Sequence, residues 1–166
     1  IGNIKIKGGV INSSSNNNSS NIYGIYNRDS GKVEIIEGVI SSIGSGNNYG
    51  IYNYGEGNII LGDKDKEISK ENPMIKGEYT GTYSSYVGYG IYNRIGNIEF
   101  YNGVIQGDKA FPGVINKVRE EYKIVNETIE GLDSLYLGKR TYENIVEIEE
   151  KKYTSLQEAI DSIGEN

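Results

Sequence analysis

The stretch YGIYN, at residues 23–27, recurs at residues 49–53 and 89–93. A second phrase recurs in step with it, and its copies are GNIKIKGGVI from Gly2, GKVEIIEGVI from Gly31, GNIILGD from Gly57 and GNIEFYNGVI from Gly96. One unit therefore consists of this phrase, a polar loop of variable length, YGIYN and a short turn. Internal periods of roughly 20 to 50 residues are typical of solenoids and other repeat architectures.

Within a unit, apolar residues alternate with polar ones at a period of two. Ile4 and Ile6 share one face of an extended chain, and Lys5 and Lys7 share the other. Later units repeat this choice with the pairs Val33 and Ile35, Ile59 and Leu61, and Ile98 and Phe100. The pattern predicts short β-strands, and a unit of this length with about three strands matches one coil of a parallel β-solenoid.

Stacked coils would place equivalent residues about 4.8 Å apart. β-Branched side chains suit the interior of such a stack, because their restricted χ1 packs well on a pleated surface. The predicted interior columns are Ile4/Val33/Ile59/Ile98, Ile6/Ile35/Leu61/Phe100, Ile11/Ile40/Ile75/Ile105 and Ile25/Ile51/Ile91. An antiparallel β-sandwich is the alternative, and it explains the alternation but not the recurrence in phase.

Each residue of YGIYN has an expected role in such a stack. The Ile points inward, the Gly allows close packing or a bend, and the Asn closes the strand at a corner. Because an amide both donates and accepts hydrogen bonds, we expect a ladder along one corner, formed by Asn27, Asn53 and Asn93. We expect an aromatic column on the outside, formed by Tyr26, Tyr52 and Tyr92.

The repeats predict a parallel β-helix over residues 1–107. The charged stretch GDKDKEISKENP, at 62–73, is expected to leave the coil as a loop or hairpin, and the Asn- and Ser-rich stretch 12–21 as a shorter excursion. From Asp108 the repeat stops, and residues 108–166 are predicted to form a small α+β cap or connector.

Local patterns suggest the content of this C-terminal part. Residues 120–129 and 133–142 are typical of an antiparallel hairpin around a turn at Gly131, and residues 144–150 alternate again. A capping-box pattern at Ser155 then predicts a short helix. Its apolar stripe would consist of Leu156, Ala159, Ile160 and Ile163.

Composition and charge exclude several classes of function. The 166 residues include no His and no Cys, so an imidazole base, a thiol nucleophile, a disulfide and a thiolate metal site are ruled out. The formal net charge is −6, and without a basic patch we expect no nucleic-acid partner. No apolar run approaches the roughly 20 residues of a membrane helix, so we expect no membrane insertion of this segment, and we expect no cofactor.

The phrases YGIYN at 49–53, GDKD…NPMIKG at 62–77, EFYNGVIQG at 99–107 and YTSLQEAIDSIGEN at 153–166 resemble a module of repetitive surface proteins of low-GC Gram-positive bacteria. The resemblance spans most of the chain. It implies a right-handed parallel β-helix of pectate-lyase-like architecture in a secreted protein at the cell wall or cell surface. Partners would be flanking modules of the same polypeptide and a carbohydrate or host surface protein. An export signal and a wall-sorting motif are expected to lie outside the chain, and no catalytic residue is carried over.

The dense acidic phrase of the repeat region is GDKDKE, which contains Asp63, Asp65 and Glu67. Alternating carboxylates can bind Ca²⁺, but Lys64 and Lys66 interrupt this series and no EF-hand loop follows. We therefore interpret the phrase as a solvated loop, with weak calcium binding as the alternative and no metal site as the prediction.

Tyrosine offers the other candidate site, because exposed rings can stack on sugar faces or on the side chains of a partner. The candidate ligand-binding residues are Tyr26, Tyr52, Tyr79, Tyr83, Tyr86 and Tyr92. The alternative is that these rings only provide packing between neighbouring strands.

Together these observations favour a non-enzymatic structural or interaction module, stalk-like or adhesin-like, of a bacterial surface protein. A polysaccharide lyase or hydrolase of the β-helix type is the alternative, with carboxylates such as Asp63, Asp65 or Glu99 in its site. A third hypothesis is a self-associating unit, because the ends of a short solenoid expose strand edges.

Overall fold

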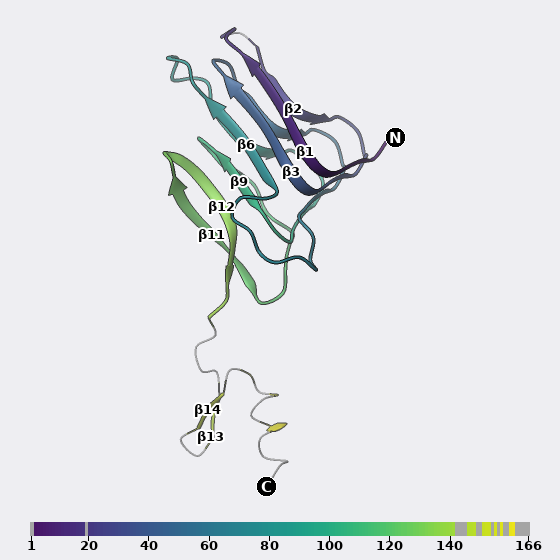
Figure 1. Cartoon of the computed structure of the whole chain (residues 1–166), viewed down its shortest axis with the longest axis vertical. Helices are drawn as coiled ribbons and strands as arrows, with labels where there is room; N and C mark the ends of the chain where they lie inside the picture. Colours follow the sequence, from purple (N-terminus) through teal and green to yellow (C-terminus); the bar gives the residue numbers. More distant parts are fainter. Residues whose placement is uncertain are drawn as a thin grey trace.

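The chain is mainly β, as the sequence predicts. The computed structural model describes residues 2–18, 20–141, 146–148, 151–153, 155, 157, 160 and 161. Among these residues no helix is long and apolar enough to cross a membrane. The strands of the described part are β1 (Ile4–Ser15), β2 (Ile22–Asn27), β3 (Val33–Gly44), β4 (Asn48–Asn53), β5 (Ile59–Leu61), β6 (Met74–Tyr79), β7 (Gly88–Asn93), β8 (Ile98–Phe100), β9 (Val104–Gly107), β10 (Lys117–Val118), β11 (Tyr122–Ile129), β12 (Leu132–Lys139), β13 (Val146–Ile148) and β14 (Lys151–Tyr153) (Figure 1).

Most strands in the described part of the chain pair in three parallel sets. The first set combines the starts of β1 and β3 with β5, β8 and β10. The second combines the ends of β1 and β3 with β6 and β9, and the third consists of β2, β4 and β7. The two halves of β3 belong to different sets because the strand turns at Gly38. The φ of Gly38 is 108°, in a region of backbone conformation that favours glycine.

The register of these sets stacks equivalent residues of successive units. The stacked columns are Ile4/Val33/Ile59/Ile98, Ile6/Ile35/Leu61/Phe100, Ile11/Ile40/Ile75/Ile105 and Ile25/Ile51/Ile91. These are the columns that the repeat predicts. The sandwich interpretation is wrong for this region, because the pairing between units is parallel.

The three sets enclose one hydrophobic core. Ile35, Ile40 and Ile51 come from different sets, yet they belong to one cluster and have no exposed surface. Phe100 and Ile105 extend this cluster toward the later units. Since burial of such a side chain stabilises a fold by about 1.5 to 3 kcal/mol, the columns are the main source of stability.

An amide ladder links the ends of the third set. Asn27 donates from Nδ2 to Oδ1 of Asn53 at 2.7 Å, and Asn53 donates from Nδ2 to Oδ1 of Asn93 at 2.6 Å. Each side chain also donates to a backbone carbonyl of its own turn, at Gly31, Gly57 and Gly96. The expected Asn corner is therefore present, and it ties each turn to the next unit.

Backbone pairing continues past Gly107, although the recognisable repeat ends there. Lys109 pairs in parallel with Tyr89, the Ile91 N–H donates to the Ala110 carbonyl, and β10 pairs in parallel with β8. The sequence pattern does not mark this partial unit, because it carries no copy of YGIYN; Ala110 is buried there and joins the core.

An antiparallel hairpin covers the last unit. β11 pairs with β12 across the turn at Gly131, as predicted, and β12 pairs antiparallel with β9. Leu135 lies opposite Ile105 and joins the core. The sheet that contains the first two sets is consequently mixed, and its expected run of parallel strands stops at this hairpin.

The two predicted excursions differ in the structure. Residues 62–73 form a loop between β5 and β6, as expected. The stretch 12–21 begins as a strand, so the prediction is wrong for Asn12–Ser15, which pair with β3. Small side chains allow this, because Ser13 stacks on Ser42 and then on Gly77, where the second and third sets approach each other closely.

Little of the predicted C-terminal helix can be compared with the structure. The residues of its apolar stripe other than Ile160 lie outside the described residues, which include helical positions at Gln157, Ile160 and Asp161. Before it, β13 and β14 form a small antiparallel pair, which agrees with the alternation seen in the sequence.

Candidate functional site

The third set carries a tyrosine face, formed by two rows of neighbouring rings. In the first row the ring centroids of Tyr23 and Tyr49 lie 5.3 Å apart, and those of Tyr49 and Tyr89 lie 5.5 Å apart. In the second row the corresponding distances are 5.5 Å for Tyr26 and Tyr52 and 5.2 Å for Tyr52 and Tyr92. The expected Tyr26, Tyr52 and Tyr92 column is therefore accompanied by a second row.

Both rows lie on one side of the sheet because the intervening Gly interrupts the alternation. The register passes directly from Tyr23 to Ile25 and omits Gly24. An added Cβ at Gly24 would meet the Gly50 carbonyl oxygen at 2.6 Å, so the Gly permits close packing of neighbouring units. The rings of Tyr23 and Tyr26 consequently stack on each other, with centroids 5.1 Å apart.

The inner rings of this tyrosine face offer no free ring face to a sugar. Tyr49 lies between Tyr23 and Tyr89 at interplanar angles of 14° and 8°, so both of its faces are covered. Tyr52 stacks on Tyr92 and on Tyr54 at interplanar angles of 6° and 13°, and Tyr26 meets it at a tilt of 59°. Sugar stacking requires an open face, and Tyr26 is the member of the predicted column that is most open, with about half of its surface exposed.

Burial raises the pKa of the two inner phenols, Tyr49 and Tyr52. Desolvation, followed by the neighbouring tyrosines, raises the pKa of Tyr49 to about 12. The same causes raise the pKa of Tyr52. The tyrosine face thus acts as a packing surface that joins successive units.

The remaining predicted tyrosines form a separate cluster at the loop after β6. Tyr79 and Tyr83 both approach Tyr86, at centroid distances of 6.0 and 6.3 Å, and the Tyr83 N–H donates to the Tyr79 hydroxyl oxygen at 2.5 Å. Beside them lies a shallow depression of about 510 Å³ lined by Tyr83, Tyr86, Ser85 and Asn16–Asn18. The structure therefore divides the predicted ligand-binding residues between two places.

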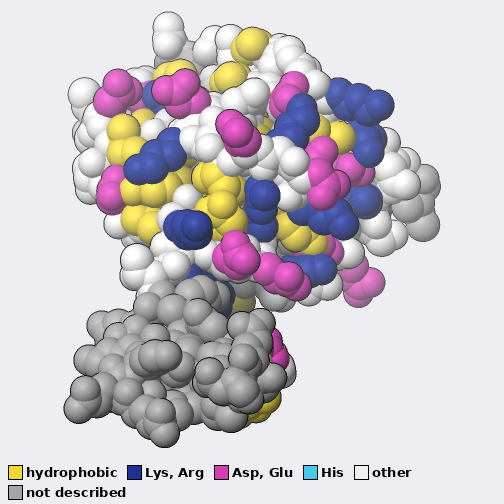
Figure 2. Space-filling model, turned by 60° about the horizontal axis from the view of Figure 1, so that its bottom comes forward, with side chains coloured by type: hydrophobic (Ala, Val, Ile, Leu, Met, Phe, Trp, Pro, Cys, Tyr) yellow, Lys and Arg dark blue, Asp and Glu magenta, His cyan; other side chains and the backbone are white. Residues whose placement is uncertain are grey.

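A groove of about 800 Å³ runs along the outer side of the first set. Its floor is made by outward-facing residues of successive units: Lys5, Glu34, Ile60, Glu99 and Lys117. Tyr101, Tyr122 and Arg119 line it as well. On the face shown in Figure 2, basic, acidic and apolar side chains are interspersed, and neither charge forms a continuous patch.

The charged groups of this groove are held by one another. Glu34 accepts from Lys5 at 2.7 Å and lies 3.1 Å from the Lys32 ammonium, and these hydrogen bonds lower the pKa of its carboxyl group. Tyr101 donates to Glu99, which raises the pKa of the Tyr101 phenol. Lys117 lies 5.7 Å from the centre of the Tyr101 ring, and its hydrogen bond with that phenol raises the Lys117 pKa.

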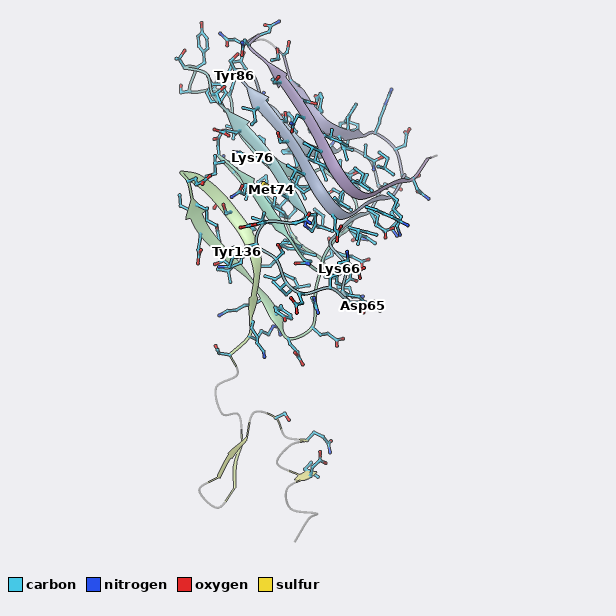
Figure 3. The ribbon with its side chains drawn as sticks, in the orientation of Figure 1. Asp65, Lys66, Met74, Lys76, Tyr86 and Tyr136 are labelled. Atoms are coloured by element: carbon cyan, nitrogen blue, oxygen red, sulfur yellow. The ribbon has the colours of Figure 1, made fainter. Side chains whose placement is uncertain are left out.

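The predicted acidic phrase divides between the groove and its surroundings. Asp63 lines the groove, whereas Glu67 lines a separate depression of about 280 Å³. The Asp65 N–H donates to the Asp63 carboxylate at 3.0 Å, and Figure 3 shows Asp65 and Lys66 on the inserted loop, far from Tyr86. Among the residues that the structure describes, no group of three carboxylates could hold a metal ion.

Sequence reasoning missed the groove as a site. Its signal is present in the alignment of the units, because Lys5, Glu34 and Glu99 occupy the same outward column. Lys117 has no such signal, since the unit to which it belongs lacks the repeat phrases.

No family model, curated protein or solved structure matches this chain. The observations that bear on its function are therefore the stacked units and two outer surfaces, the groove and the depression at Tyr83 and Tyr86.

Proposed function

We propose that this chain is a non-enzymatic structural and interaction module, stalk-like or adhesin-like, of a secreted bacterial cell-surface protein. In this proposal its parallel sets form a short right-handed parallel β-helix, and flanking modules of the same polypeptide extend it. The observation that carries the proposal is the stacking of equivalent residues in every set, with an amide ladder along one corner.

The mechanical part of the role follows from the direction of the interactions. Neighbouring units are joined by backbone hydrogen bonds along the stacking direction, by the Asn ladder and by the stacked tyrosines. Each contact is local to two successive units, so the fold transmits force from unit to unit and can be lengthened by adding units. Such a rod displays its outer surfaces at a distance from its attachment.

The interactive part is assigned to the groove, with a carbohydrate as its ligand. Carbohydrate sites combine an aromatic surface with polar groups that fix orientation. Tyr101 supplies the aromatic surface, and Glu34, Glu99 and Lys117 supply acceptors and donors along an open channel. The depression at Tyr83 and Tyr86 is the second surface of this kind.

Binding to an array of bacterial and host glycans tests the role. We expect a retained glycan class, with binding reduced at least about tenfold by Tyr101→Ala, equivalent to about 1.4 kcal/mol. Tyr54→Ala removes an exposed tyrosine that does not line the groove and should leave binding unchanged. Equal binding by both variants would refute the groove as the site.

A polysaccharide lyase or hydrolase is the second candidate, because the groove brings Asp63 and Glu99 together with Lys117. Carboxylate pairs carry out acid–base chemistry on glycosidic bonds. Assays for reducing ends and for unsaturated products on pectin, alginate and host glycans separate the two candidates. Turnover that Glu99→Gln abolishes would replace the non-enzymatic proposal with the enzymatic one.

A further inference from the structure

The two ends of the stacked units differ. At the later end, β12 pairs with β9 and the hairpin covers the core. At the first end, β1 pairs with β3 and β2 pairs with β4, and neither strand has a second partner among the described residues. Figure 1 shows β1 and β2 at this uncovered side of the molecule. We name the surface formed by β1 and β2 the open edge.

Two core positions of the first unit, both in β1, are exposed at the open edge, whereas Ile25 in β2 is 6% exposed. Ile4 is 39% exposed, whereas Val33, the next residue of its column, is 1% exposed. Ile11 is 36% exposed, whereas Ile40 behind it has no exposed surface. In these two columns the aliphatic side chain is therefore buried wherever another unit lies over it.

The Asn ladder is also incomplete at this edge. Asn53 accepts from Asn27, and Asn93 accepts from Asn53, so each Oδ1 receives the amide of the preceding unit. Asn27 donates its own Nδ2 in this way, but its Oδ1 accepts no hydrogen bond from the described residues. The open acceptor is suited to an amide donor from one more unit.

The outer charges of β1 specify the same neighbour. Lys5 lies beside Glu34 and Lys7 beside Glu37 in the register of β1 with β3. Lys side chains on an unpaired edge strand disfavour pairing with an arbitrary strand. A strand that carries carboxylates opposite Lys5 and Lys7 would instead be attracted to β1.

We propose that the open edge binds a further coil of the same repeat, in parallel and in register with β1 and β2. The existing interfaces continue into it: aliphatic residues cover Ile4 and Ile11, an Asn donates to Asn27, and Glu residues lie over Lys5 and Lys7. The inference rests on one part of the proposed function, namely that the three sets form the stacked coils of a parallel β-helix.

The chain itself supplies the occupant for a test. A copy of residues 31–56, fused directly before Gly2, keeps the phase of the repeat, because Glu56 precedes Gly57 in the native chain just as it would precede Gly2. This copy would place Glu34 over Lys5, Ile40 over Ile11 and Asn53 over Asn27 in the register of β1 with β3 and of β2 with β4. The matched control carries Ile35→Asp and Ile51→Asp within the added copy only.

Thermal unfolding and hydrogen exchange of the 166-residue chain and both extended chains give the readout. We expect the correct copy to raise Tm by about 2 °C or more and to slow exchange of the amides of residues 4–15 at least about tenfold. The control copy should change neither quantity. No difference between the two copies would overturn the inference.

The alternative occupant is a second copy of the chain in a head-to-head dimer. Light scattering over a concentration series distinguishes it: a dimer of the 166-residue chain that the added copy dissociates would overturn the proposal, and a monomer supports it.

Glycan turnover by the chain would refute the non-enzymatic role without altering the expected changes in Tm and in hydrogen exchange. Failure of the proposed function and failure of this inference can therefore be told apart.

Discussion

Asn53 and Asn93 are joined by a side-chain hydrogen bond of 2.6 Å between Nδ2 and Oδ1, across the interface of two successive units. The same Nδ2 group donates to the Gly57 carbonyl of its own turn and to the Ile95 carbonyl of the next. Asn53 has no exposed surface. One buried amide thereby fixes two turns relative to each other, which backbone pairing of the strands alone would not do.

Replacing Asn53 should consequently destabilise the fold. Asn53→Ala leaves buried carbonyl and amide groups without partners, and we expect the free energy of unfolding to fall by about 1 to 3 kcal/mol. Urea titration followed by circular dichroism measures this loss. Asn21→Ala is the control, because Asn21 is exposed and accepts one long hydrogen bond from Asn47. A similar effect of both variants would contradict the role of the ladder.

The column of Ile11 and Ile40 allows the same substitution to be compared at two depths. Ile40→Ala removes a fully buried side chain and should lower the free energy of unfolding by about 2 to 5 kcal/mol. Ile11→Ala, at the open edge, should cost about 1 kcal/mol or less. Equal losses at the two positions would show that the edge is covered in solution.

These columns were predictable because the repeat aligns them in the sequence. The pairing of Ile25 with Ile51 and of Ile51 with Ile91 follows from the three copies of YGIYN. The partial unit at 109–118 was not predictable, since its pairing depends on backbone groups and on Ala110 rather than on a repeated phrase. The antiparallel pairing of β12 with β9 was missed for a similar reason: the hairpin is visible locally, but its docking partner is not.

The surfaces were harder to predict than the core. The stacking of Tyr49 between two other rings depends on the close approach at Gly50, which spacing in the sequence does not reveal. The properties of the groove depend on which side chains surround each of its charged groups. Glu34 looks like an ordinary surface residue in the sequence, yet the structure places two ammonium groups beside it.

Glu34 should make stability depend on pH. Its hydrogen bonds with Lys5 and Lys32 lower its pKa from the ordinary value of 4.5 in the folded state. The stabilisation is therefore fully present above pH 4.5 and is lost as pH falls through the lowered folded pKa. Thermal unfolding between pH 2 and 7 should show that Glu34→Gln lowers Tm above about pH 5 and converges with the native chain at the acid end.

Salt provides the control for this effect. The groups are near the surface, so the difference between Glu34→Gln and the native chain should shrink at about 1 M salt, where the Debye length is about 3 Å. A Tm difference that is independent of both pH and salt would indicate that the side chain acts through packing instead.

Tyr49 should ionise later than an ordinary tyrosine. Its pKa of about 12 lies above the ordinary value of 10.0, so the folded state holds the phenolic proton more tightly than the unfolded state. The corresponding stability is fully present below pH 10 and is lost as pH rises toward 12. Ultraviolet titration of phenolate formation should show a late component that Tyr49→Phe removes.

The Gly of YGIYN is required by close packing rather than by an unusual backbone conformation. Gly50 is not among the glycines with positive φ. A Cβ added there would lie 2.6 Å from the Gly90 carbonyl oxygen and 2.8 Å from Cγ2 of Ile75. Because the first of these atoms is backbone, relief would require neighbouring units to separate, which would weaken both the hydrogen bonds of β4 with β7 and the stacking of Tyr49 on Tyr89.

Gly50→Ala should therefore lower the free energy of unfolding by about 1 to 3 kcal/mol, measured by urea titration. Gly2→Ala is the matched control, because an added Cβ there meets no atom within 4 Å, and it should be neutral or slightly stabilising. If instead the turn needed only flexibility, Ala at position 50 would stabilise the fold by about 0.4 to 1 kcal/mol through a less disordered unfolded chain. The sign of the change thus separates packing from flexibility as the reason for the recurring Gly.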